Sequence, residues 1–101
     1  MITTVYDTVK RLVIGNIPGL DPITVFIENY QPGQGRITVR CWGTAWTSYW
    51  GAMSDKSVEE FVASADIGYL VSNLTRSDRK PTKQETAWLT KIMTVVREQL
   101  S

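Results

Sequence analysis

The sequence contains no histidine, so the side chain that most often acts as a general base near neutral pH is missing. This absence excludes Ser-His-Asp and Cys-His sites built from this chain alone. Cys41 is the only cysteine, which excludes an internal disulfide and a zinc site made of cysteine and histidine ligands. The carboxylates show no spacing typical of metal ligands. We therefore predict no metal, no cofactor and no enzymatic activity.

Long apolar stretches are also missing. None approaches the ~18 residues that a membrane-spanning helix needs, and residues 1–10 lack the regions of a signal peptide. We therefore expect a cytoplasmic protein with no membrane partner. The 11 Lys and Arg residues against 10 Asp and Glu leave a net charge of +1, so the overall charge indicates no nucleic-acid partner. The 101 residues fit a single domain, residues 1–101.

Alternation of apolar and polar residues predicts β-strands in the first half of the chain. Residues 23–30 alternate between two faces, with Ile23, Val25 and Ile27 on one and Thr24, Phe26 and Glu28 on the other. Residues 36–42 resume the pattern, with Ile37, Val39 and Cys41 facing inward and Arg36, Thr38, Arg40 and Trp42 facing outward. Residues 31–35 have hairpin length, and we expect their glycines to adopt positive φ.

Residues 43–53 fit two structures. Read as a strand, they put Trp46 and Trp50 on one face with Trp42, and that face also carries Arg36 and Arg40. Read as a helix, they align Trp46, Tyr49, Trp50 and Met53. The flanking glycines and the threonines favour the strand.

Helix signals dominate the second half. Ser57 and Glu60 have the spacing of a capping box, and so do Thr82 and Glu85, which directly follow Pro81. Asp66 is suited to cap a short helix between them, and the last helix should run to about Leu100. We predict an α+β fold: a three- to four-stranded antiparallel meander packed against two short helices and one long C-terminal helix.

The concentration of aromatic rings near the middle of the chain is the strongest candidate site. The predicted partner-binding residues are Trp42, Trp46, Tyr49, Trp50, Arg36 and Arg40. Rings with guanidinium groups on one exposed face suit a protein hot spot or stacking on bases. The same rings would equally fill the space between sheet and helices. The spacing does not decide between these two interpretations.

A basic loop is the second candidate. Arg76, Arg79, Lys80 and Lys83 lie within eight residues with only Asp78 to oppose them. This cluster is a candidate for binding the phosphates of a nucleic acid. Solvated charge on a loop is the commoner meaning of such a run.

Three segments together resemble small proteins encoded by tailed phages and prophages. They are a Gly-rich turn and β segment with Trp-x-x-Tyr-Trp-Gly at residues 35–53, an acidic Phe-containing helix at 57–61, and Asp66 with Tyr69 and Leu70. The chain differs from that pattern in having Ser54 for glycine and Ala65 for cysteine. The resemblance implies a bacterial cytoplasm and a phage accessory or early gene. It assigns no catalytic or binding residue.

These observations give three hypotheses of function. The leading one is a non-enzymatic phage accessory protein that binds a host or phage protein, for example to inhibit a host defence or replication component. The second is a nucleic-acid-binding factor of phage replication or recombination that uses the aromatic and arginine residues. The third is a sponge for a nucleotide signal. A homodimer is compatible with all three, because Trp-rich strands often bury apolar area between subunits.

Overall fold

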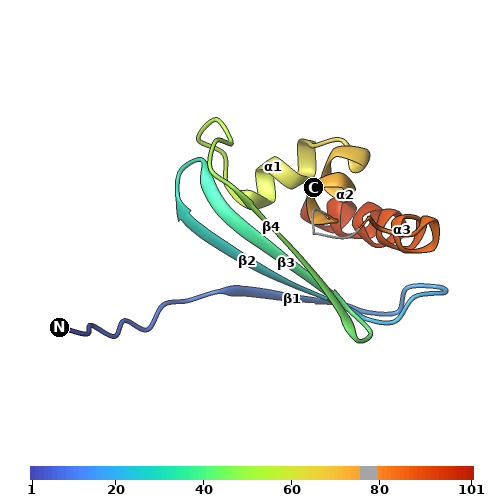
Figure 1. The fold of residues 1–101 in the computed structure, drawn as a ribbon, viewed down its shortest axis with the longest axis horizontal. Coiled ribbons are helices and arrows are strands. Elements are labelled where there is room, and N and C mark those ends of the chain that lie inside the picture. The colour runs from blue at the N-terminus through green and yellow to red at the C-terminus, as the bar shows by residue number, and fades with distance from the viewer. Residues whose placement is uncertain (76–79) are drawn as a thin grey trace.

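The computed structural model describes residues 1–75 and 80–101, and its fold is α+β, as predicted (Figure 1). Four antiparallel strands lie in the order in which they follow one another along the chain: β1 (Lys10–Ile14), β2 (Ile23–Gln31), β3 (Gln34–Cys41) and β4 (Thr44–Trp50). Three helices follow: α1 (Val58–Ser64), α2 (Ile67–Leu74) and α3 (Lys83–Leu100). The strand interpretation of residues 44–50 is therefore confirmed.

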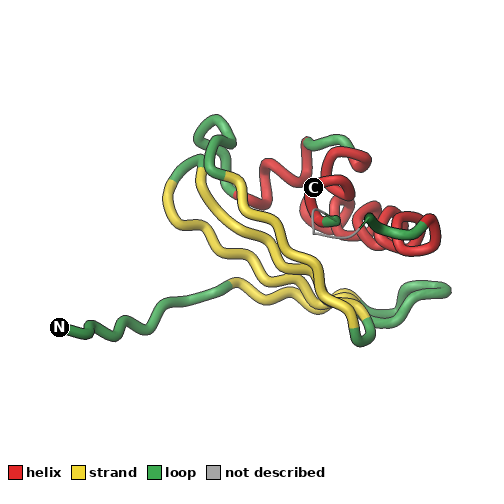
Figure 2. Tube along the Cα trace, in the orientation of Figure 1, coloured by secondary structure: helices red, strands yellow, loops and turns green. Residues whose placement is uncertain are grey.

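The helices all lie on one side of the sheet, and residues 1–9 extend away from it (Figure 2). The side chains between the two layers form the core. From the strands the core takes Ile23, Val25, Ile27, Ile37, Val39, Cys41, Trp46 and Trp50. From the helices it takes Val58, Val62, Leu70, Val71, Leu74, Leu89, Ile92, Met93 and Val96. The predicted division of β2 and β3 into two faces is thus confirmed.

The three helices begin where their capping residues predict. Ser57 and Glu60 form the complete capping box of α1, each side chain accepting from the other's backbone N–H. Asp66 and Thr82 each accept a bond from the backbone N–H three residues further on. Within the described ranges, no helix is both long enough and apolar enough to cross a membrane.

Side chains tie the start of α1 to the sheet. Asn29 accepts a bond from the Val58 N–H at 2.8 Å and donates one to Glu59 at 2.8 Å. Lys10 also donates to Glu59. Burial raises the pKa of Glu59, but the bonds from Lys10 and Asn29 together outweigh this effect. The pKa of Glu59 therefore lies below its ordinary value.

The two glycines of the β2–β3 hairpin serve different purposes. Gly33 has φ +83°, as expected for a turn, and its backbone bonds to Lys56 and Met53. Gly35 lies inside β3, and the expectation of positive φ is wrong there. It is needed because an added Cβ would lie 2.4 Å from Cγ2 of Val58 and 2.5 Å from the Glu28 carbonyl oxygen.

Candidate binding surface

The face of the sheet that turns away from the helices has no described helix over it (Figure 2). Strand alternation and register determine which side chains it carries. We call this surface the open face; its residues are Arg11, Val13, Thr24, Phe26, Glu28, Tyr30, Arg36, Thr38, Arg40, Ala45, Thr47 and Tyr49. An uncovered sheet face of this composition is a candidate site for a partner.

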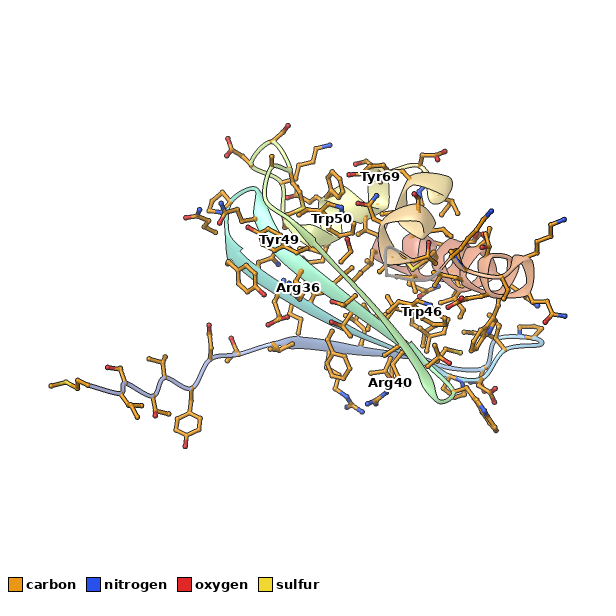
Figure 3. All side chains as sticks on the ribbon, viewed as in Figure 1. Arg36, Arg40, Trp46, Tyr49, Trp50 and Tyr69 are labelled. Atoms are coloured by element: carbon orange, nitrogen blue, oxygen red, sulfur yellow. The ribbon has the colours of Figure 1, made fainter. Side chains whose placement is uncertain are left out.

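Rings and guanidinium groups interleave on the open face (Figure 3). The Arg36 guanidinium lies over the Tyr49 ring at 5.7 Å, and the Arg40 guanidinium lies over the Phe26 ring at 5.5 Å. Tyr30 stacks on Tyr49 with centroids 6.2 Å apart and planes at 29°. Arg36 also donates to the Thr47 hydroxyl at 3.1 Å. These contacts place each of the two guanidinium groups beside an aromatic ring.

Positive charge exceeds negative charge on this surface. Arg11, Arg36 and Arg40 stand against one carboxylate, Glu28, which is paired with Arg36 in the strand register. In the part of the chain that the structure describes, none of these arginines forms a salt bridge. Apart from the Arg36 donor that bonds to Thr47, their described hydrogen-bond donors are thus available for an anionic partner.

The prediction that Trp46 and Trp50 share an exposed face with Arg36 and Arg40 is wrong. The two tryptophans are 5% and 6% exposed and lie on the helix side of the sheet (Figure 3). The reason is a two-residue turn at positions 42–43, where Trp42 has φ +58°. The turn reverses the chain and changes which residues of the next strand face inward.

The buried rings pack against helices. Trp46 meets Trp88 of α3 edge-on at 5.1 Å, and its indole N–H donates to Glu85 at 3.3 Å. Trp50 packs against Phe61 of α1 at 5.0 Å. The interpretation of these rings as core is therefore confirmed for Trp46 and Trp50.

The other two predicted aromatic residues are exposed. Trp42 is 77% exposed at the tip of the β3–β4 turn, and Tyr49 is 47% exposed on the open face. Of the six predicted partner-binding residues, the structure brings three together on one surface: Arg36, Arg40 and Tyr49.

Sequence reasoning missed Phe26, Tyr30 and Arg11 as members of this surface. A signal for Phe26 was present, because alternation placed this large ring on the polar face of its strand. Alternation also places Tyr30 on this polar face, with Thr24 and Phe26, although the pairing of β2 with β3 is irregular beside it.

The predicted basic cluster lies elsewhere. Lys80 and Lys83 are exposed, and they stand just before and at the start of α3, in the helix layer. Arg76 and Arg79 lie outside the described residues. The cluster therefore adds no described charge to the open face.

A hollow beside α3 and the buried thiol of Cys41 offer no reactive site. The hollow has a volume of about 510 Å³ and is lined by Thr44, Thr82, Gln84, Glu85 and Trp88. The charged side chain among these residues is the Glu85 carboxylate, which would repel the phosphates of a nucleotide. Cys41 is buried and donates to the Asp21 carbonyl at 3.6 Å. Burial, and secondly the Asp21 carboxylate, raise the pKa of the Cys41 thiol, which makes it a poor nucleophile.

Comparison with known proteins gives one family match. A family model described as a phage family, Phage_phiTE_072, matches residues 2–100. Neither the curated proteins nor the solved structures provide a match. The matched range includes every residue of the open face.

Proposed function

Because the chain belongs to the phage family Phage_phiTE_072, we propose that it is a phage accessory protein that binds single-stranded nucleic acid with its open face. It acts by binding and not by catalysis, in the cytoplasm of the infected bacterium. The observation that carries the proposal is the interleaving of aromatic rings, two of them about half exposed, with arginines on a sheet face that no described helix covers.

The rings supply the stacking surface. Tyr30 and Tyr49 are both about half exposed, and Phe26 lies on the same face of β2, with Glu28 between it and Tyr30. Aromatic side chains on a four-stranded sheet stack unpaired bases, typically about two or three of them. Each stacked base contributes roughly 1–3 kcal/mol, with little dependence on sequence.

The arginines supply contacts to phosphate. Arg11, Arg36 and Arg40 come from two strands and flank the rings, so a backbone crossing the sheet meets a cation beside each stacked base. Arginine binds phosphate through a planar fork of donors and also stacks on rings. The charge is local, which explains how a chain of net charge +1 can carry an anion-binding surface.

The shape of the surface favours single strands. Strands lie ~4.8 Å apart, so a four-stranded face is roughly 15 Å across, a width that suits a few unstacked nucleotides. Reading a duplex instead requires a helix or ribbon that enters a groove. The open face consists of strands that lie side by side in one sheet.

A protein partner, such as a host defence or replication component that this chain would inhibit, is the second candidate. It is favoured by exposed apolar side chains away from the open face: Trp42 at the β3–β4 turn and Ile2, Val5 and Tyr6 in the N-terminal segment. Such groups are typical of protein interfaces. Trp46 and Trp50 are buried and support neither candidate.

Binding of fluorescein-labelled single-stranded DNA and RNA oligonucleotides, followed by fluorescence anisotropy, tests the proposal. We expect Tyr49→Ala to weaken binding by ~1–3 kcal/mol, because it removes one stacking ring. Tyr49→Phe keeps the ring and should bind like the wild type. Lys91→Ala removes an exposed cation from α3 and serves as the control for charge alone.

Absence of binding at low ionic strength would overturn the proposal. So would equal loss of affinity in Lys91→Ala and Tyr49→Ala, because that would mean that the interaction follows overall charge and not the open face. The second candidate would be established instead if the wild type captured a protein whose binding persisted after nuclease treatment and if the Trp42→Ala variant no longer captured that protein.

A further inference from the structure

In the described part of the chain, the edge strand β4 shows no feature that prevents another strand from pairing with it. It is last in the strand order, so β3 is the strand that bonds to it. Its seven residues include no charged residue and no proline. Among the described residues, no other segment bonds to its backbone. Monomeric proteins normally protect such an edge, because its free N–H and C=O groups are a template for another strand.

The opposite edge of the sheet is protected. Strand β1 has only five residues, and two of them are Lys10 and Arg11. Lys10 lies in register with Ile27, on the helix side, and donates to Glu59 of α1. A short strand with an inward-pointing charge is a common defence against pairing between molecules. The two edges of this sheet therefore differ in kind.

The hydrogen-bond pattern of β4 defines which residues would pair. Cys41 and Thr44 flank a two-residue turn, so their backbones form a hydrogen-bonded pair. Hydrogen-bonded and non-hydrogen-bonded pairs then alternate along the β3–β4 hairpin. The backbone groups of Ala45, Thr47 and Tyr49 consequently point away from β3. A two-fold axis at Thr47 would pair Thr47 with Thr47 of a second copy, and Ala45 with Tyr49 of that copy. All of these outward-pointing N–H and C=O groups would then have hydrogen-bond partners.

The side chains fit in the same register. On the open face, the large ring of Tyr49 would lie beside Ala45 of the second copy. On the helix side, Trp46 would lie beside Ser48 and Trp50 beside Thr44. Large residues thus meet small ones at each of these positions, and β4 brings no like charges together.

From these observations we propose that the chain forms a homodimer by antiparallel pairing of β4 with β4 of a second copy, about a two-fold axis at Thr47. The two sheets become one, and their open faces adjoin on the same side. The inference does not depend on the proposed function. Pairing of the two sheets would double the width of the proposed binding surface, measured across the strands.

Sedimentation velocity of the full chain over a dilution series tests the pairing. We expect a dimer for the wild type and for Thr47→Val, which keeps the strand preference. Thr47→Pro should be monomeric with an unchanged circular dichroism spectrum, because the N–H that proline removes points away from β3. Thr47→Lys should be monomeric as well, since it places two charges side by side.

Oxidation of Thr47→Cys gives a second measurement that does not depend on how the proline variant folds. Paired residues at a bonded position have Cα atoms about 5.5 Å apart, which permits a disulfide. We expect a cross-linked dimer. A monomeric wild type, a dimer that persists in both Thr47→Pro and Thr47→Lys, or a failure of Thr47→Cys to cross-link would each overturn the inference.

Discussion

Replacing Gly35 by alanine should destabilise the protein strongly, although it adds a single methyl group. The new Cβ would lie 2.5 Å from the Glu28 carbonyl oxygen and 2.4 Å from Cγ2 of Val58. The valine side chain can move, but the carbonyl belongs to the neighbouring strand and is part of the β2–β3 ladder. Either β3 or the start of α1 must therefore shift.

The expected cost follows from the nature of the two contacts. Overpacking a well-filled core costs typically ~1–3 kcal/mol, and a clash with backbone belongs at the upper end of that range. We expect Gly35→Ala to lower the free energy of unfolding by about 2–3 kcal/mol. For a domain of this size, that corresponds to a fall in Tm of roughly 10–20 °C. Urea unfolding monitored by circular dichroism measures the change.

Gly43→Ala is the matched control, because an added Cβ there meets nothing within 4 Å and its φ is not positive. It should change stability by less than ~0.5 kcal/mol. Adding Val58→Ala to Gly35→Ala should cost less than the sum of the single changes, since it removes one of the two contacts. A Gly35→Ala protein as stable as the wild type would refute the reasoning.

Three further predictions test the core, the charges and the open face. Trp46→Phe should be more destabilising than Trp50→Phe by ~1–2 kcal/mol in urea unfolding, because only the first loses a described indole hydrogen bond, that to Glu85. The pKa of Glu59 is lowered in the folded state, so its contribution to stability is present above its unfolded pKa and is lost as the pH falls through its folded pKa. Glu59→Gln should therefore reduce the loss of stability between neutral and acidic pH, and an unchanged pH dependence would contradict the assigned bonds. The logarithm of the oligonucleotide affinity should fall with the logarithm of salt concentration with a slope near −2 for about three phosphate contacts, and Arg40→Ala should reduce that slope by ~0.7.

Local signals in the sequence predicted most of the fold. Helix starts were readable because Ser57, Asp66 and Thr82 bond to backbone only three residues away. The strands of the β2–β3 hairpin were readable because their inner and outer faces differ in polarity along nearly the whole length. These signals depend on neighbours in the chain and need no knowledge of tertiary contacts.

The error at the aromatic cluster has a specific physical cause. Apolar and polar residues alternate through positions 36–50, and Gly43 is the one glycine among them, with no Asn, Asp or Pro beside it to fix a turn at Trp42 and Gly43. Turns of this length favour Asn-Gly or Gly at positions of positive φ, and tryptophan is unusual there. Because of the turn at 42–43, Trp46 lies on the helix side and Tyr49 on the open face, the reverse of what a continuous strand predicts. The candidate site therefore contains Tyr49 in place of Trp46.

Gly35 shows a second limit. From sequence, a glycine that allows positive φ and a glycine that allows close approach look the same. The distinction depends on Val58, which is far along the chain and reaches Gly35 only after α1 packs on the sheet.

The most direct test of the central claim is a titration of the ¹⁵N-labelled protein with a single-stranded oligonucleotide, followed by the backbone amide signals in NMR spectra. We expect the amide signals that shift to belong to open-face positions, such as Thr24, Phe26, Thr38 and Arg40, and the signals of α3 to remain unshifted. Movement centred on Lys80 and Lys83, or no movement at saturating oligonucleotide, would contradict the assignment of the open face as the binding surface.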